Sequence, residues 1–383
     1  MEYRVRTIRD EAGLERLQGE WDGLLERSRG GSIFASFAWN SAWWQFFGKG
    51  ARLYIVVVSD SEGQVCGIAP LMLRRAGLLR RLEFIGTGLS DAGDFVLDPD
   101  HAEEALAAIF AYLGKHNRAW DITDLDEVPP YSPLARFLET KRPPGLRVLA
   151  LPRNDCPYIP VPATWEAYTK TLQRKPRQHL EGFARRVIEE TGATFRLVTK
   201  EAEAPAAVER FYALHRARWD TKDDELNPEH LTPEFVAFLE EACRRSAAHG
   251  SLRLTELCVE DAPIASWIGF LVNGRWSGYM TGFDPAWSAK RPGKVLHGFV
   301  MREAMKQGAF EIDEGRGAEP YKYELGAISR QSWRFMLTSN RPRSLMALGL
   351  VKGRVRARDL VRRYRERTTG DARQTTTEMA SEQ

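Results

Sequence analysis

The sequence predicts an α/β protein built from two similar modules in tandem. With 383 residues the chain is too long for one ordinary domain and suits two domains that each bury a core. Its apolar, charged, Gly and Pro fractions are those of a globular protein. The same order of expected elements, helix, helix, hairpin, strand, helix and strand, occurs once in each half of the chain.

The first half contains segments of helical and of strand periodicity. A stripe of leucines with Trp21 marks the first helix, and Gly30-Gly31 ends it. A second helix is rich in aromatic residues and has a strongly apolar face. In chain order, we expect helices over residues 10–27 and 38–47, strands over 53–59, 65–74 and 82–85, a helix over 102–116 and a strand over 120–125.

The second half repeats this order after a proline-rich stretch, residues 128–162, which is typical of a region joining two domains. In chain order, we expect helices over residues 165–172 and 177–191, a strand over 194–198, helices over 204–219 and 234–248, strands over 252–259, 264–272 and 275–283, a helix over 294–307 and a strand over 310–313. The expected parts are domains over 1–150 and 151–340, a basic helical extension over 341–367 and a disordered tail over 368–383.

Composition excludes several classes of protein. The N-terminal residues mix charged and apolar side chains, unlike a signal peptide, and the apolar runs are far shorter than the roughly 20 residues of a membrane helix. We therefore expect a cytoplasmic protein, with a peripheral place at the inner membrane surface as an alternative. The four cysteines lack metal-ligand spacing, so we expect reduced structural thiols and no metal. A net charge of +3 gives no bulk electrostatic reason for specific DNA binding.

One segment of the second half has the pattern of a ligand site. A strand ends at Phe283, and a loop ending in Arg291-Pro292-Gly293 leads into a helix at Lys294. Helix N-termini present unpaired N–H groups and partial positive charge, so this start could seat a phosphate, with added contacts from Arg291 and Lys294. Taken alone, an Arg-Pro-Gly more often only begins a helix. Here, however, the next strand leads into acids, glycines, a Tyr and a Lys, at a strand end where open α/β sheets bind ligands.

Residues 282–327 resemble the signature of the Gcn5-related N-acetyltransferase (GNAT) superfamily, in its cellulose-biosynthesis (CelD-like) branch, which is related to the Fem-type aminoacyl transferases. The matching residues are Pro292, Gly293, Asp313, Gly315, Gly317, Tyr321 and Lys322. Residues 34–44, 67–71, 84–94, 174–192 and 215–219 also resemble the branch. The resemblance implies tandem GNAT-like modules, each a mixed twisted sheet flanked by helices, plus a basic C-terminal helix. It also implies an acyl-CoA site in the second module, where the N–H groups of Gly293, Lys294 and Val295 would bind the CoA pyrophosphate.

Acyl transfer to an amine requires a base, stabilisation of the oxyanion and an acid for the leaving thiolate. The candidate bases are Asp313, Glu314, Glu319 and Asp284, for each of which a solvated loop charge is the alternative. Tyr321 could protonate the leaving group or only pack, and Lys322 could bind phosphate or the oxyanion or be a surface cation. The candidate substrate-binding residues are His215, Arg218, Trp219, Gly315 and Gly317.

The expected function is N-acyl transfer from acyl-CoA, above all acetyl-CoA, to an amino sugar or amino acid, in envelope polysaccharide or secondary metabolism. Lys290-Arg291 stand where the family loop has an aromatic and a small residue. A Fem-like, aminoacyl-tRNA-dependent transferase is therefore an alternative. Two observations favour it: this departure, and the basic stretches at residues 174–186 and in the tail, which could bind tRNA. A non-catalytic accessory protein is a third hypothesis. The basic stretches could also bind an anionic membrane surface, and the oligomeric state is left open.

Overall fold

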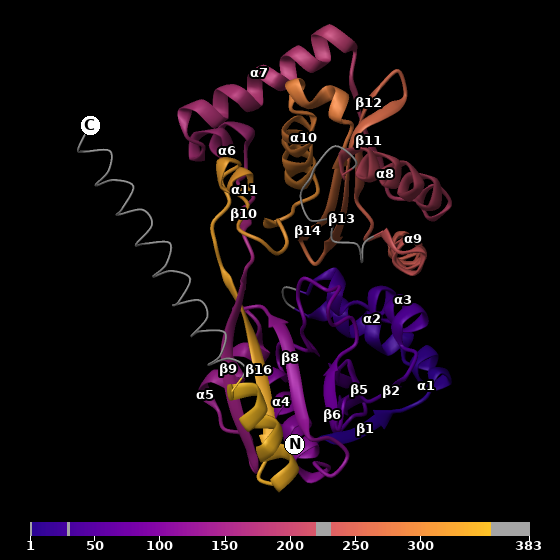
Figure 1. Ribbon diagram of the computed structural model, residues 1–383, viewed down its shortest axis with the longest axis vertical. Coiled ribbons are helices and arrows are strands. Elements are labelled where there is room, and N and C mark those ends of the chain that lie inside the picture. The colour runs from indigo at the N-terminus through magenta and orange to yellow at the C-terminus, as the bar shows by residue number, and fades with distance from the viewer. Residues whose placement is uncertain (1, 29–30, 220–230, 354–383) are drawn as a thin grey trace, which may run out of the picture.

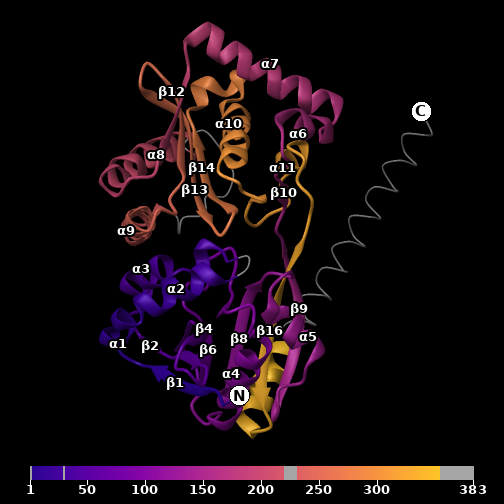
Figure 2. The ribbon, with the colours of Figure 1, turned by 180° about the vertical axis from the view of Figure 1, so that it is seen from behind.

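The computed structural model describes residues 2–28, 31–219 and 231–353. Two lobes are stacked along the long axis of the molecule (Figures 1 and 2). The N-terminal lobe is the lower one in Figure 1 and contains β1 to β9 and β16, while the C-terminal lobe contains β10 to β15. The predicted fold class, tandem modules with mixed sheets flanked by helices, is confirmed.

The N-terminal lobe begins with a strand that the sequence did not predict, and residues 10–27 form two helices instead of one. The elements are β1 (Arg4–Ile8), α1 (Glu11–Arg16), α2 (Gln18–Arg27), η1 (Ile33–Ala35), α3 (Phe37–Phe47), β2 (Ala51–Leu53), β3 (Ile55–Ser59), β4 (Val65–Ala69), β5 (Leu71–Ala76), β6 (Leu79–Phe84), β7 (Val96–Leu97), α4 (Ala102–Lys115), β8 (Ile122–Val128), α5 (Pro133–Thr140) and β9 (Leu146–Asp155). Pro70 separates β4 from β5, which therefore enter different sheets.

A strand from far along the chain completes the N-terminal lobe. The lobe has a four-stranded sheet in the order β1-β3-β4-β7 and a six-stranded sheet in the order β2-β5-β6-β8-β16-β9. Strand β16 (Gln331–Ser339) pairs antiparallel with both β8 and β9. The sequence analysis grouped residues 331–339 with the second domain, whereas their hydrogen bonds lie in the sheet of the first. Strand β16 therefore ties the end of the chain to the N-terminal lobe.

The C-terminal lobe is one six-stranded sheet in the order β10-β15-β14-β13-β12-β11 with helices on both faces. Its elements are β10 (Tyr158–Pro160), α6 (Trp165–Thr171), α7 (Arg174–Thr191), β11 (Thr194–Val198), η2 (Glu201–Glu203), α8 (Ala204–Trp219), α9 (Pro233–Ala248), β12 (Leu254–Val259), β13 (Ala262–Val272), β14 (Arg275–Phe283), η4 (Pro285–Lys290), α10 (Pro292–Lys306), β15 (Glu311–Asp313) and α11 (Pro320–Glu324). Two separate apolar clusters show that α10 packs on one face of this sheet and α8 with α9 on the other.

The two lobes share one hydrophobic core. The aromatic face of α3 packs on α9, and the Trp39 ring lies edge-on to Phe238 and Tyr279, with ring centroids 5.0 Å apart in each case. The apolar face predicted for residues 38–47 is thus buried against the other lobe, where aromatic pairs add to the energy of area burial. All four cysteines are buried and free.

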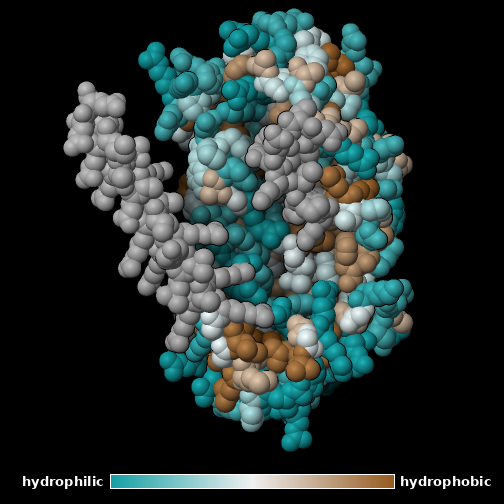
Figure 3. Space-filling view, in the orientation of Figure 1, coloured by the Kyte–Doolittle hydropathy of each residue, from teal (hydrophilic) through white to brown (hydrophobic). Residues whose placement is uncertain are grey.

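A final helix starts at residue 342 and reaches residue 353, where the described part of the chain ends. The rest of the predicted basic extension and the tail over 368–383 lie outside the described residues. The helix leaves an apolar patch exposed at the lower end of the molecule, visible as brown atoms in Figure 3, to which Leu345, Met346 and Leu350 contribute. Among the described helices, none combines the length and apolar composition of a membrane span.

Candidate functional site

Strands β14 and β15 separate at the centre of the C-terminal lobe. They run parallel and pair over three positions only, from Arg275↔Glu311 to Ser277↔Asp313. Strand β14 continues to Phe283, whereas β15 ends at Asp313. Beyond Ser277 the edge of β14 is therefore no longer paired with β15, and the carboxyl ends of strands in open α/β sheets are where ligands bind.

Helix α10 follows β14 through η4, and the four residues predicted to bind the donor are its N-cap residue Arg291 and three residues of its first turn, Gly293, Lys294 and Val295. Arg291 precedes the helix in the left-handed region, with φ 52° and ψ 51°, and its carbonyl accepts the N–H groups of Lys294 (3.0 Å) and Val295 (3.2 Å). A Cβ added at Gly293 would meet no atom within 4 Å, so the space beside this turn is open. The Lys294 ammonium forms an ion pair with Glu324 of α11. The helix start is thus open at Gly293, while the neighbouring Lys294 is already paired with Glu324.

The loop after β15 is shaped by two glycines and fixed by a buried lysine. Gly315 and Gly317 have φ of 71° and 103°, which disfavours other residues. A Cβ at Gly315 would also lie 2.7 Å from the Asp91 Oδ2 atom. Lys322 is 3% exposed, and its Nζ donates to the carbonyls of Arg316 (2.9 Å) and Gly317 (3.1 Å). Lys322 therefore stabilises the loop after β15 by binding its backbone carbonyls.

Replacing Lys322 with Met is expected to destabilise the protein by about 2–4 kcal/mol, because two loop carbonyls lose a charged donor. Lys200→Met is the matched control, since that lysine is 77% exposed and its ion-pair partner among the described residues is Glu203. This change should cost less than about 1 kcal/mol. Urea unfolding of both variants measures the difference. Equal stability of the two variants would contradict the structural role of Lys322.

Three of the other predicted catalytic residues, Asp313, Glu319 and Asp284, each bind a partner close by. Asp313 forms an ion pair with Arg330, with 2.6 Å between Oδ2 and Nη2. Glu319 pairs with Lys322 at 2.8 Å, and Asp284 accepts a backbone N–H at the start of η4 at 2.9 Å. Tyr321 lies on the outer side of α11 with 40% of its surface exposed. Asp313, Glu319 and Lys322 are thus brought into one loop region, whereas Asp284 follows the end of β14 and accepts the N–H of Ala286 in η4.

A buried pair within the same segment, His297 with Glu314, is the strongest candidate for proton transfer. His297 Nε2 lies 2.7 Å from Glu314 Oε1, and the two side chains are 5% and 4% exposed. The imidazole stacks on Trp267, and its buried Nδ1 has no hydrogen-bond partner in the described part of the chain. Glu314 was one of the candidate bases of the sequence analysis. No spacing rule, however, links it to His297, because His297 lies in α10 and Glu314 follows the next strand, β15. Only the fold brings them together.

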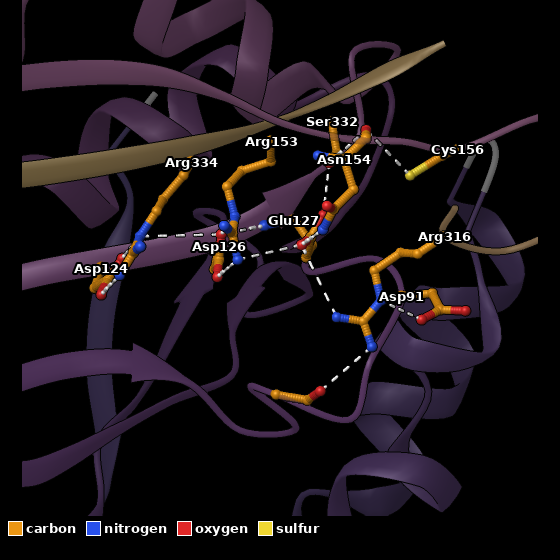
Figure 4. A network of polar contacts seen from close by, with 11 residues as sticks. Asp91, Asp124, Asp126, Glu127, Arg153, Asn154, Cys156, Arg316, Ser332 and Arg334 are labelled. Atoms are coloured by element: carbon orange, nitrogen blue, oxygen red, sulfur yellow. Dashed lines mark hydrogen bonds and ion pairs between the residues drawn. The ribbon is translucent and has the colours of Figure 1, made fainter. Parts of the chain in front are cut away.

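Arg316, between the two glycines, joins the loop to the N-terminal lobe (Figure 4). Its guanidinium donates to Asp91 Oδ1 (2.5 Å) and to the carbonyl of Gly88 (3.3 Å), and it lies 3.9 Å from Glu127. Burial raises the pKa of Asp91, and the Arg316 guanidinium opposes that rise. The polar network around them also contains Asp124, Asp126, Arg153, Asn154, Cys156, Ser332 and Arg334. The Gly-Arg-Gly loop is therefore also a contact between the lobes.

Near this contact, burial raises the pKa of Asp94 to about 7, although Ser132 donates to its Oδ1 at 2.7 Å. Because the folded state holds the proton more tightly than the unfolded state, this carboxyl group should reduce stability as the pH rises from about 4 to 7. We expect Asp94→Asn to stabilise the protein at pH 8 by about 2 kcal/mol and to have little effect at pH 4. Urea unfolding at both pH values tests this, and an effect independent of pH would contradict it.

The predicted substrate-binding residues of α8 are separated from the His297–Glu314 pair. His215 is buried, stacks on Phe211 and has its Nδ1 3.4 Å from the carbonyl of Thr281 on β14. It lies on the sheet face opposite α10. The side chains of Arg218 and Trp219 lie outside the described part of the structure. Within the described residues, no group of three or more potential metal ligands occurs.

Residues 174–323 match a family model described as an acetyltransferase (GNAT) domain. No curated protein matches the sequence. Among solved structures, FemX has a TM-score of 0.63 at 11% identity, with 88% of this chain and 97% of that chain covered. The C-terminal domain of a putative lysylphosphatidylglycerol synthetase from Agrobacterium fabrum has a TM-score of 0.53 at 12% identity, covering 88% and 95%. L-PGS from Bacillus licheniformis has a TM-score of 0.51 at 13% identity, covering 90% and 96%.

The family match contains the whole segment from α10 to Lys322, and the structural similarities extend over both lobes. With identities this low the similarities establish the fold, and the family model establishes the domain in the second half. Residues 174–323 therefore match the GNAT domain model, and the two-lobed fold of the chain is similar to that of FemX.

Proposed function

We propose that this protein transfers an acyl group from acyl-CoA, in the simplest case acetyl-CoA, to a primary amine of an amino sugar or amino acid. The observation that supports this proposal most strongly is the buried His297–Glu314 pair, located where β14 and β15 separate and within the segment matched by the GNAT model. Acyl transfer to an amine needs a group that accepts a proton in a site shielded from water.

The pair has the chemistry that this reaction requires. When the Nε2–H of His297 donates to Glu314, Nδ1 carries the free lone pair of a neutral imidazole. Attack of the amine nitrogen on the thioester carbonyl forms the new C–N bond, and His297 Nδ1 accepts the proton that the amine loses. Collapse of the tetrahedral intermediate breaks the C–S bond, and the same proton can then neutralise the thiolate. In this scheme Glu314 fixes the tautomer and orientation of the imidazole.

For the donor, the proposal uses the predicted residues at the start of α10. The open space at Gly293 gives a phosphate access to the positive end of the helix. Lys294 would exchange its ion pair with Glu324 for a phosphate contact, and Arg291 is exposed at the same turn. The N–H groups of Lys294 and Val295 would share their bonds between the phosphate and the Arg291 carbonyl.

Isothermal titration of the full chain with acetyl-CoA and with longer acyl-CoAs tests the donor. We expect saturable heat with at least one of them, followed by release of the CoA thiol when a panel of amino sugars and amino acids is added. Gly293→Asp is the matched variant, because it places a carboxylate in the open space and should abolish binding without crowding the fold. Absence of any heat with every acyl-CoA would refute an acyl-CoA donor.

A Fem-like reaction with aminoacyl-tRNA is the second candidate, and helix α7 favours it. This helix runs along the top of the C-terminal lobe (Figure 1) and carries Arg174, Lys175, Arg177, Arg185 and Arg186. Such a basic surface suits a polyanion. Binding of aminoacyl-tRNA that weakens steeply with salt, combined with no acyl-CoA binding, would favour this candidate. An anionic membrane surface is a further possible partner, through the basic final helix and its exposed apolar patch.

A further inference from the structure

Two elements form an exposed apolar patch at the lower end of the N-terminal lobe (Figure 3). The final helix, residues 342–353, contributes Leu345, Met346 and Leu350, whose exposed fractions are 37%, 53% and 54%. The turn between β5 and β6 adds Leu78, which is 86% exposed. We call these four side chains the basal patch. Single exposed leucines are ordinary, whereas apolar side chains gathered on one surface mark a place of interaction.

The final helix and the β5–β6 turn are neighbours. Arg343 of the helix donates through Nη2 to the carbonyl of Leu78 at 2.8 Å. Beneath this contact, Ala347 packs in one small apolar cluster with residues of β6 and β8. Arg343, Met346 and Leu350 are spaced i, i+3 and i+7, so they share the side of the helix that faces solvent. The four apolar side chains therefore belong to one surface.

Leu78 occupies a place where a leucine adds little to the fold. Ala76 pairs with Leu79, so Gly77 and Leu78 form a two-residue turn, and Gly77 has φ 61°. Such turns are usually made of Gly, Asn, Asp or Ser, because they project into water. A leucine that projects beyond its strands and is largely exposed buries its surface only when an apolar partner arrives.

Positive charge surrounds the basal patch. Arg75 and Arg80 face each other across the hairpin, one position behind the turn, and Arg343 lies in the final helix. Residues 74–81 and the final helix contain no Asp or Glu. Asp121, which lies 2.9 Å from Arg80 and 3.9 Å from Arg343, is 0% exposed and presents no charge to solvent. The outward charge around the apolar side chains is therefore positive.

These charges distinguish between the partners that could cover the patch. A second copy of the chain would place two positively charged surfaces against each other, which is unfavourable. The next part of the chain, residues 354–367, contains seven arginines and two acidic residues, so its charge has the same sign. An anionic bilayer matches both features, because its acyl chains accept apolar side chains and its phosphates pair with arginine and lysine.

We propose that the basal patch docks this protein on the surface of an anionic phospholipid bilayer. The exposed apolar side chains insert among the acyl chains, and the neighbouring arginines bind the lipid phosphates. Helix α7 and the start of α10 belong to the upper lobe (Figure 1), so the candidate donor site stays in contact with water when the protein is docked. This docking does not depend on the proposed acyl transfer.

Co-sedimentation of the full chain with vesicles tests the proposal. We expect binding to equimolar phosphatidylcholine and phosphatidylglycerol, and much weaker binding to phosphatidylcholine alone. Leu78→Ser with Leu350→Ser should weaken vesicle binding at least about tenfold, because two inserted side chains are lost. Arg75→Glu with Lys352→Glu should also weaken it at least about tenfold, because attraction to the anionic surface becomes repulsion. All four side chains are exposed, so the fold should tolerate both double variants.

Ile188→Ser in α7 and Lys170→Glu in α6 are the matched controls, because both residues are exposed in the other lobe. Each should change vesicle binding by less than about twofold. Failure to bind anionic vesicles, equal binding to both lipid compositions, or unchanged binding by both double variants overturns the proposal. Weakening by the controls alone also overturns it, because the lipid contact would then lie on the C-terminal lobe.

Sedimentation equilibrium without lipid tests a second copy of the chain as the partner. We expect the leucine double variant and the unmodified chain to have the same oligomeric state. A dimer that only the unmodified chain forms, together with no vesicle binding, would assign the basal patch to an interface between copies. Because neither assay contains an acyl donor, vesicle binding without any acyl-CoA binding would count against the proposed function alone.

Discussion

Glu314→Gln should lower the rate of acyl transfer by about 10²–10⁴-fold while leaving acetyl-CoA binding unchanged. The amide keeps the shape of the side chain and can still accept a hydrogen bond from His297 Nε2, but it removes the negative charge that stabilises the imidazolium formed during the reaction. A loss of this size, about 3–5 kcal/mol in the activation free energy, is typical of a disabled general base. The measurement is thiol release from acetyl-CoA at saturating amine.

His297→Ala should cause a loss of similar size, because the proton acceptor itself is removed. Added imidazole should restore part of the rate in this variant, and it should not do so in Glu314→Gln. Such rescue separates a chemical role from a packing role, since the ring also stacks on Trp267.

Asp313, Glu319 and Asp284 provide the matched controls for this test. Each was a candidate base, but each has a local partner: Arg330 for Asp313, Lys322 for Glu319, and a backbone N–H for Asp284. Glu319→Gln is the mildest change, because that side chain is 52% exposed, and it should retain most of the rate. If Glu319→Gln loses activity and Glu314→Gln does not, the assignment of the proton acceptor to His297 is wrong.

Local patterns in the sequence predicted much of the C-terminal lobe. The strand expected over 275–283 coincides with β14, and the helix expected over 294–307 overlaps α10 (Pro292–Lys306). These elements are long and periodic, so their type follows from neighbouring residues alone. Strand β16 was not predicted because its partners β8 and β9 lie roughly two hundred residues earlier in the chain, and a strand's sheet cannot be inferred from its own residues.

The candidate site and the roles of its residues stay predictions, and the structure adds the setting of each residue. The motif around Gly315, Gly317 and Lys322 was identified as chemically important, and the structure adds that Lys322 is buried beneath the loop. The role of a residue such as Lys322 depends on its exposure and on its hydrogen-bond partners, and neither can be inferred from the residue type alone.

The contact between the lobes leads to the second large effect. Arg316→Met should destabilise the protein by about 3–5 kcal/mol at pH 8, because it leaves the Asp91 carboxylate, 14% exposed, without its cation. Arg6→Met is the control, since Arg6 and Glu20 form an ion pair that is 46% and 45% exposed, and such pairs contribute less than about 1 kcal/mol. Urea unfolding monitored by far-UV circular dichroism provides the comparison.

The destabilisation caused by Arg316→Met should depend on pH and on the presence of Asp91, and these two dependences make the prediction specific. Burial already raises the pKa of Asp91, and loss of Arg316 should raise it further, because the opposing cation is gone. The destabilisation should therefore shrink as the pH falls and the unpaired carboxyl group takes up a proton. For the same reason, Asp91→Asn in the Arg316→Met background should recover part of the lost stability at pH 8 and less at pH 5. If the double variant is as unstable as the sum of the two single variants at both pH values, the ion pair does not couple the lobes.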